Sequence, residues 1–263
     1  MNKENKPLIL LSNDDSVNAP GLKELINMLQ PLGNLVVVAP DVPRSGTSHA
    51  LTVDYPLKVV KLEESEGLTI YSCSGTPADC VKVANSCLLP HRPDLMVSGI
   101  NHGSNSSISI IYSGTMGAAT EAAILGIPSI GFSLCDHSQN ADFTATVAYG
   151  RVITEQVLKT GLPQNISLNI NVPLLPSEKI KGIKVCRQNK GVWNEDFEKK
   201  TDPETGEELY WLAGYYVNEE PRAVGTDETA LEDGYIAVVP VQCDMTAYDA
   251  IEKMKNLEKL VAK

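Results

Sequence analysis

Short apolar runs alternate with amphipathic segments through the first two-thirds of the chain. The run Leu8–Leu11 has the length of a buried strand, and the segment after it, Gly21–Leu29, has the spacing of a helix. Further runs lie at 35–39, 57–62, 68–72, 95–98, 129–132 and 167–171, and further helical segments at 78–89, 115–125 and 142–159. Strands that alternate with helices favour a largely parallel sheet covered on both faces. We predict an α/β fold with a Rossmann-like, three-layer core over residues 1–175.

The sequence changes in character after Val172. Residues 188–224 are charged and rich in turn residues, with aromatic side chains at 193, 197, 210, 211, 215 and 216, which predicts a β-hairpin arm. A strand is predicted at about 234–240, and an apolar stripe predicts a terminal helix at about 245–262. We group residues 176–263 as a C-terminal extension. Exposed aromatic residues on such an arm indicate a contact with another chain or a ligand, or a small local core.

Charge and cysteine content limit the class of protein. The net charge of −11 argues against binding a nucleic-acid polymer, because that needs clustered Lys and Arg. An anionic substrate would then need a local positive centre, which a bound metal can supply. The six cysteines form no C-x-x-C pair, so we expect reduced thiols. The apolar run near the start is too short for a signal peptide or a membrane helix, so we expect a cytoplasmic protein without a membrane partner.

Two adjacent carboxylates, Asp14 and Asp15, follow the first predicted strand. In parallel α/β sheets, the loops at the carboxyl ends of the strands converge to form the site. Adjacent like charges are costly unless a cation lies between them, and hard divalent cations prefer oxygen ligands. The alternative is a solvated turn, or a helix cap that uses an aspartate.

Two more polar loops follow predicted strands. The loop at 39–49 contains Ser45 and Gly46, which suit a metal or a phosphate, although two prolines there are also typical of a plain turn. The loop at 98–105 contains Asn101, the best-placed neutral oxygen ligand. His102, its neighbour, is either a general acid or a packed structural histidine.

A fourth loop, at 112–119, runs into a predicted helix. Free backbone N–H groups at a helix start bind phosphate. Ser113, Gly114 and Thr115 lie at this start, where small residues leave room for an anion. Small residues at a helix start also serve tight packing, so the convergence of four polar loops on one sheet edge carries more weight than this motif.

With these loops the chain resembles the survival protein E (SurE) family of 5′-nucleotidases. The resemblance covers almost the whole length, in order and with appropriate spacing. The matching stretches are LLSNDDSVNAPG, VVVAPDVPRSGTSHALT, SGTPADCVKVA, PDLMVSGINHGSN, IYSGTMGAATEA and TDETALEDGYIAVVPVQCDMTAY. One departure is visible: the family commonly reads S-N-D-D-G, and this chain has Ser16 after Asp15. Glycine there favours a positive φ, which serine adopts at some cost.

The resemblance implies a phosphomonoesterase that converts nucleoside 5′-monophosphates to nucleoside and phosphate. It implies one divalent cation per subunit, Mg²⁺, Mn²⁺ or Ca²⁺, held by Asp14, Asp15, Ser45 and Asn101. The residues expected to line the substrate and phosphate pocket are Asn13, Ser45, Gly46, Asn105, Ser113, Gly114 and Thr115. The family forms dimers, often tetramers, by exchanging C-terminal elements, so a homodimer or homotetramer is expected. Base preference, 3′-nucleotides and short polyphosphate stay open as substrates.

The expected mechanism is attack of a metal-activated water on phosphorus, in line with the leaving oxygen. Backbone N–H groups near Thr115 would stabilise the phosphoryl oxygens. Either Asp14 or Asp15 could accept the proton of the water, so the general base is left open. His102 is the reserve candidate that protonates the leaving oxygen.

Three alternatives were weighed. A phosphoaspartate phosphatase with Asp14 as nucleophile usually needs a second carboxylate at position 16, which is serine here. A two-metal phosphoesterase needs several histidines, and this chain has four, scattered at 49, 91, 102 and 137. A non-catalytic nucleotide-binding module would be expected to show a glycine-rich fingerprint, and neither G-x-G-x-x-G nor a Walker loop is present. Phosphate release from AMP with and without EDTA separates these hypotheses.

Overall fold

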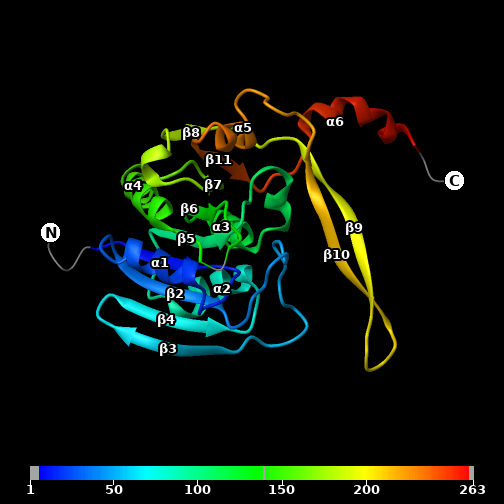
Figure 1. Ribbon diagram of the computed structural model, residues 1–263. Helices are drawn as coiled ribbons and strands as arrows, with labels where there is room; N and C mark the ends of the chain where they lie inside the picture. Colours follow the sequence, from blue (N-terminus) through cyan, green and yellow to red (C-terminus); the bar gives the residue numbers. More distant parts are fainter. Residues whose placement is uncertain (1–5, 139, 261–263) are drawn as a thin grey trace.

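The computed structural model describes residues 6–138 and 140–260. In this part of the chain, a nine-stranded sheet forms the centre of the molecule (Figure 1). Its strands, in spatial order, are β3 (Val59–Ser65), β4 (Leu68–Cys73), β2 (Asn34–Pro40), β1 (Leu8–Ser12), β5 (Leu95–His102), β6 (Ser129–Leu134), β7 (Ile166–Val172), β11 (Ile236–Gln242) and β8 (Ile183–Val185). The six strands from β4 to β7 run parallel, while β3 and β11 each pair antiparallel with their inner neighbour. The predicted α/β fold is confirmed.

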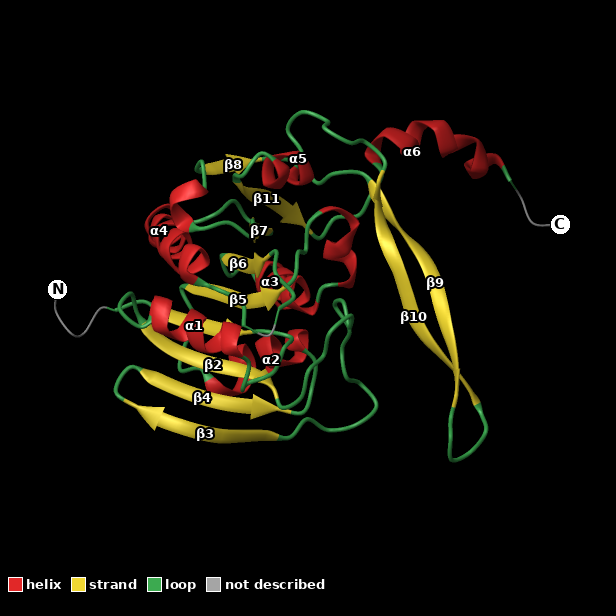
Figure 2. Cartoon of the chain, viewed as in Figure 1, coloured by secondary structure: helices red, strands yellow, loops and turns green. Residues whose placement is uncertain are grey.

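Helices cover both faces of this sheet (Figure 2). The helical segments of the body are α1 (Pro20–Leu29), α2 (Pro77–Val83) with a π-helical turn (Ala84–Leu88), a 3₁₀ helix η3 (Ser107–Tyr112), α3 (Gly114–Ile124), α4 (Thr144–Thr160), a 3₁₀ turn (Ser177–Lys179) and α5 (Asp227–Glu232). Helix α6 (Tyr248–Met254), with a 3₁₀ turn (Lys255–Lys259), lies away from the sheet and buries none of its residues (Figure 1). Successive strand residues point to opposite faces. On β1, Ile9 and Leu11 join the core under α1 and α4, while Leu10 joins the core under α2 and α3.

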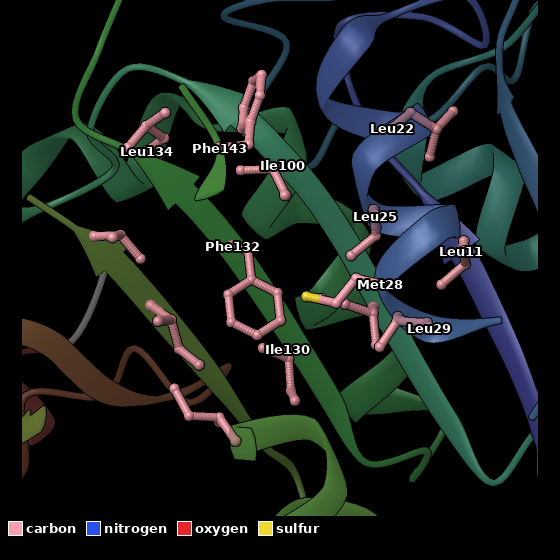
Figure 3. Packing of buried hydrophobic residues seen from close by; sticks show 14 of the residues in the cluster. Leu11, Leu22, Leu25, Met28, Leu29, Ile100, Ile130, Phe132, Leu134 and Phe143 are labelled. Carbon is pink, nitrogen blue, oxygen red and sulfur yellow. The ribbon is translucent and has the colours of Figure 1, made fainter. Parts of the chain in front are cut away.

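The largest hydrophobic core lies between the sheet and the helices α1 and α4 (Figure 3). Helix α1 begins at Pro20, whose fixed φ suits the first helical position. It contributes Leu22, Leu25, Met28 and Leu29, which recur at helical spacing and are fully or almost fully buried. They pack toward side chains of β5 and β6, including Phe132 (Figure 3). This packing places the loop between β1 and α1 at the carboxyl edge of the sheet.

The C-terminal part leaves the sheet and then returns to it. Strands β9 (Gly191–Thr201) and β10 (Glu208–Asn218) form a separate two-stranded antiparallel hairpin within the predicted arm. Figure 1 shows this hairpin standing beside the main body. The chain then returns through α5 to β11, at 236–242 where 234–240 was predicted, so the sheet itself continues past residue 175. Helix α6 lies inside the predicted terminal helix; residues 261 and 262 of that prediction lie outside the described residues.

No helix within the described ranges has both the length and the apolar character needed to span a membrane.

Candidate metal and phosphate site

The loops after β1 and β2, the end of β5 and the start of α3 meet around one cavity of about 540 Å³. Each of the strands is parallel to its neighbour, so their carboxyl ends reach the same edge of the sheet. All four predicted metal ligands line this cavity, as do four other predicted site residues. The eight are Asp14, Asp15, Ser45, Gly46, Asn101, His102, Asn105 and Ser113. The structure therefore brings together residues from positions 14 to 113.

Asp14 is buried at the bottom of this arrangement. The hydroxyl of Thr115 donates a hydrogen bond to its Oδ1 over 2.5 Å. Burial raises the pKa of Asp14 to about 6; the Thr115 hydrogen bonds oppose the shift, and the neighbouring Asp15 charge adds to it. The ionised carboxylate is thus poorly compensated by the described residues. A cation at this position would relieve that cost.

Asp15 and Asn13 each keep a buried oxygen without a hydrogen-bond partner. Among the described residues, neither Oδ2 of Asp15 nor Oδ1 of Asn13 receives a hydrogen bond. Nδ1 of His102 lies 3.7 Å from Oδ2 of Asp15, which is too long for a good hydrogen bond. Buried polar atoms without partners call for a specific explanation, such as a bound ion. The site therefore fits the divalent cation that the loops predict.

The other two predicted ligands are neutral oxygens. Asn101 donates from its Nδ2 to the backbone oxygen of Gly103 over 2.8 Å, so the amide nitrogen is engaged and the amide oxygen is the atom that could bind a cation. Ser45 is exposed and lines the cavity. Its loop is attached to η3 by a hydrogen bond in which the Ser48 backbone N–H donates to the Tyr112 backbone oxygen over 3.1 Å. Within the described residues, no group of three or more His, Cys, Asp or Glu side chains gathers as a metal site. Two carboxylates and two neutral oxygens are hard donors that suit Mg²⁺, Mn²⁺ or Ca²⁺.

The same loop is also anchored on α3 by a hydrogen bond between His49 and Glu121. Nε2 of His49 lies 2.8 Å from Glu121, whose other carboxylate oxygen lies 2.7 Å from Nζ of Lys82. Burial would raise the pKa of Glu121, but hydrogen bonds from His49 and Lys82 outweigh it and lower that pKa. Glu121 therefore stays ionised and links α2, α3 and the Ser45 loop.

The start of α3 lies directly against Asp14. Ser113 caps the helix by accepting a hydrogen bond from the Met116 backbone N–H over 3.0 Å. At Gly114, a Cβ atom would lie 2.8 Å from Cβ of Asp14, so a side chain there would press on the carboxylate. Thr115 bonds to Asp14 with its hydroxyl, and its backbone also lowers the Asp14 pKa by a hydrogen bond.

Three of the predicted pocket residues do not line the cavity: Asn13, Gly114 and Thr115. Asn13 is buried and donates from Nδ2 to the backbone oxygen of Ser16 over 2.9 Å, which shapes the turn that holds the two aspartates. Gly114 and Thr115 lie next to Asp14 at the start of α3 and do not line the cavity themselves. Their contact with phosphate stays a prediction, while the hydrogen bond from Thr115 to Asp14 is observed.

Known proteins resemble this chain over most of its length. The sequence model of the family described as "Survival protein SurE" matches residues 9–195. The chain belongs to the SurE family. It is 54% identical to a protein named 5′-nucleotidase SurE from Christiangramia forsetii, over 97% of this chain and 98% of that protein. It is 50% identical to the protein of the same name from Phocaeicola vulgatus, over 97% and 98%.

A solved SurE structure has the same fold. The crystal structure of the SurE protein from Aquifex aeolicus is 41% identical in sequence and superposes with a TM-score of 0.81. The match covers 96% of this chain and all of that one. The SurE resemblance stated from the sequence motifs is therefore confirmed.

Ser16 is the point at which the chain departs from the usual SurE pattern. Its φ is 94°, the left-handed region in which glycine is favoured. Its backbone oxygen accepts hydrogen bonds from Asn13 and from the Ala19 N–H, so the surrounding turn maintains this conformation. The conformational cost that the sequence predicts for a serine at position 16 is therefore present in the turn that carries Asp14 and Asp15.

Ser16→Gly is expected to stabilise the protein. Relief of the left-handed serine should raise the free energy of unfolding by about 1 kcal/mol, which corresponds to a melting temperature about 2–4 °C higher. Calorimetry on the two proteins in EDTA is the measurement. Ser106→Gly is the control, because Ser106 has a φ of −73° and no such strain to release. An unchanged or lower melting temperature for Ser16→Gly would contradict the prediction that the left-handed serine is strained.

His102 lies at the rim of the SurE site with a second histidine. Its ring contacts Phe143 edge to face, with 5.1 Å between the ring centroids. His137, which sequence reasoning missed, also lines the cavity, and its ring packs where a side chain at Gly103 would lie. His102 is therefore placed both to prop the Asn101 loop and to face a substrate, and its role as an acid stays a hypothesis.

The remaining cavity residues were not predicted as site residues. They are Ser104, Ser109, Tyr112, Trp193, Glu195, Leu212, Ala213 and Gly214. The first three lie in or beside loops that the sequence had marked as polar, so a wider window around Asn105 and Ser113 would have found them. The other five belong to the β9–β10 hairpin, far away in sequence. Their aromatic content was visible, but nothing local showed which residues face the cavity.

Proposed function

We propose that this chain hydrolyses nucleoside 5′-monophosphates to nucleoside and phosphate, with one divalent cation per subunit. The observation that carries this proposal is the meeting of Asp14, Asp15, Ser45 and Asn101 in one cavity beside Ser113 at the start of α3. The curated relatives of the chain are named 5′-nucleotidase SurE. The enzyme is thus a hydrolase that acts on nucleotide phosphomonoesters.

The proposed roles follow from the position of each side chain. Asp14, Asp15, Ser45 and Asn101 would hold the cation. When bound, it supplies Lewis-acid polarisation of the phosphoryl group and a more acidic water. The start of α3 favours an anion, because its first backbone N–H groups carry partial positive charge. The Ser113 hydroxyl, on the cavity wall, can donate to a phosphoryl oxygen while it accepts from Met116.

Proton transfer would use the groups around Asp15. The Asp15 carboxylate keeps a buried oxygen free of hydrogen bonds within the described residues, so it can accept a proton or hold a water in place. His102 lies next to Asp15 on the cavity wall and can donate to the leaving oxygen. We propose His102 for that role. A loss of activity in His102→Gln that is larger for AMP than for p-nitrophenyl phosphate would support it, because only the poor leaving group needs the proton.

A substrate panel under several metals tests the activity. Phosphate release would be measured for the four 5′-nucleotides, 3′-AMP, ribose 5-phosphate, glycerol phosphate and tripolyphosphate, each with Mg²⁺, Mn²⁺, Ca²⁺ or EDTA. We expect turnover of 5′-nucleotides with metal, none in EDTA, and recovery after metal is returned. Equal rates on every phosphate would reject a nucleotidase and leave a general phosphatase. Full activity in EDTA would reject the cation.

We propose that the chain forms a homodimer or homotetramer through the C-terminal extension, 176–263. Large apolar side chains are exposed on the hairpin and on α6, including Phe197, Tyr215, Tyr248 and Met254. An apolar stripe of this size is usually covered in an oligomer. Light scattering of the full chain and of a chain that ends at Asp244 is the test. A full-length monomer at micromolar concentration would contradict the proposal, and an unchanged mass of the folded shorter chain would remove α6 from the interface.

We also propose the cytoplasm as its compartment. All six cysteines are free, and Cys73, Cys80 and Cys186 are buried as small apolar residues. Reduced cysteines are typical of a reducing compartment. Fractionation of the source cells with an antibody to the chain would test this.

A further inference from the structure

The β9–β10 hairpin forms part of the lining of the cavity. Its lining residues lie far from the proposed metal ligands in the sequence, and most of them are apolar. Trp193 and Glu195 are two residues apart on β9 and therefore lie on the same face of the hairpin. From β10, Leu212, Ala213 and Gly214 line the same cavity. Figure 2 shows the hairpin beside the edge of the sheet where the parallel strands end. Residues of the proposed phosphate site and an aromatic side chain thus line the same cavity.

Two contacts fix the orientation of the Trp193 indole ring. Its indole N–H donates to Oγ of Ser109 on η3 over 3.3 Å. The Tyr216 ring contacts it edge to face, with 6.3 Å between centroids and 63° between the planes. Tyr216 is itself fixed, because its hydroxyl donates to Oγ of Ser107 over 2.8 Å and accepts from Nδ2 of Asn189 over 3.0 Å. Trp193 nevertheless remains 43% exposed, so the indole has a set orientation and a free surface.

The position diagonal to Trp193 on the neighbouring strand has no side chain. Trp193 pairs with Tyr216 and Glu195 pairs with Gly214, so Gly214 is the diagonal neighbour of the indole. Gly214 has a φ of 134°, and a Cβ atom there would lie 2.4 Å from the backbone oxygen of Asn194. Glycine is therefore required at this position. Its absence of a side chain lets β10 approach the backbone of β9 next to Trp193.

The cavity lining combines two kinds of chemistry. The loops of the sheet edge contribute the proposed oxygen ligands Asp14 and Asp15 and the helix start at Ser113. The hairpin contributes Trp193 and the carboxylate of Glu195, which repels a phosphate. A phosphate ester whose phosphate lies at the proposed metal ligands would therefore place its organic group against the hairpin.

We propose that Trp193 is the platform on which the base of the nucleotide stacks. This inference rests on the proposed nucleotidase function and specifies how the substrate is recognised. Every base offers a π-face to an aromatic platform, so stacking on Trp193 tolerates all four bases. Purines, which have the larger ring, should bind more tightly than pyrimidines.

Kinetics on a substrate with a base and one without provide the test. Stacking contributes about 1–3 kcal/mol per base, so Trp193→Ala should raise KM for AMP by about five- to 150-fold. The kcat/KM for ribose 5-phosphate, which has no base, should stay within about twofold. Trp193→Phe should fall between these, because it keeps a smaller ring. Trp211→Phe, on the same hairpin but outside the cavity, is the matched control and should leave both substrates unchanged.

Fluorescence gives a readout that does not depend on turnover, because the chain has only two tryptophans. In Trp211→Phe, Trp193 is the sole indole, and adenosine with Mg²⁺ should quench its emission while ribose does not. In Trp193→Phe, adenosine should leave the emission of Trp211 unchanged.

Several results would overturn the platform. An unchanged KM for AMP in Trp193→Ala would do so, as would equal losses on AMP and ribose 5-phosphate, which would mark Trp193 as a structural prop of η3. Absence of quenching by adenosine in Trp211→Phe would also contradict it. If the unmodified protein released phosphate from no ester, the proposed function would fail, and adenosine quenching would still decide whether Trp193 binds a base.

Discussion

Asp15→Asn and Asp14→Asn are each expected to lower the metal-dependent kcat/KM for AMP by about a thousandfold or more. Each substitution removes one of only two carboxylates among the proposed ligands, and the two neutral oxygens left cannot compensate the charge of a divalent cation. The measurement is phosphate release against Mn²⁺ concentration. Near-normal activity of either variant at limiting metal would show that the cation is bound elsewhere.

Asp14→Asn is also expected to stabilise the metal-free protein, and this effect depends on pH. The pKa of Asp14 is raised from 3.8 to about 6, so folding penalises its ionised form. The penalty is absent below about pH 4, grows between pH 4 and 6, and is complete above pH 6. A shift of this size corresponds to about 3 kcal/mol at pH 7. The asparagine variant lacks the penalty, and Thr115 can still donate to its amide oxygen.

Urea denaturation in EDTA at pH 7.5 and at pH 4 would measure this. We expect Asp14→Asn to be more stable than the unmodified protein at pH 7.5, with the difference vanishing near pH 4. Asp41→Asn is the matched control: this aspartate lies in the neighbouring loop, is exposed and does not line the cavity. A stabilisation of Asp14→Asn that is the same at both pH values would assign it to packing and not to the ionisation of Asp14.

Gly21→Ala is expected to destabilise the protein by about 3 kcal/mol. Gly21 lies in the first turn of α1, and a Cβ atom there would lie 2.0 Å from the backbone oxygen of Ile100 on β5. Backbone cannot rotate away as a side chain can, so α1 or the end of β5 must move. The gain in helix propensity from glycine to alanine is only about 1 kcal/mol, so the clash dominates. Because Asn101 follows Ile100, affinity for Mn²⁺ should fall as well.

Gly150→Ala is the matched control for this prediction. Gly150 also lies in a helix, α4, and its nearest neighbour is Sδ of Met28, 2.9 Å from the added Cβ. A flexible thioether can shift at low cost, so we expect a change in stability within about 1 kcal/mol. Urea denaturation compares the two variants, and metal titration by calorimetry follows the site. Equal stability losses would show that the backbone contact at Ile100 is not decisive.

Much of the fold follows from local pattern. The sequence pattern indicates which residues are buried in each element. Examples are the apolar runs at Leu8–Leu11 and Leu95–Ser98 and the helical spacing in Gly21–Leu29. This is because the side-chain period of a strand or a helix is a local property. Strand order is different: β11 returns antiparallel beside β7 after the hairpin has left the sheet, and no local period encodes that pairing. Its free energy comes from contacts between residues far apart in the chain.

The candidate site divides in the same way. Asp14, Ser45 and Asn101 could be predicted as neighbours from sequence, because parallel strands bring their carboxyl ends to one edge whatever the details of packing. Only the tertiary structure decided that Thr115 bonds to Asp14 and that Trp193 faces the cavity. Those contacts depend on how α3 and the hairpin pack against the sheet, and packing is set by the shapes of many distant side chains acting together.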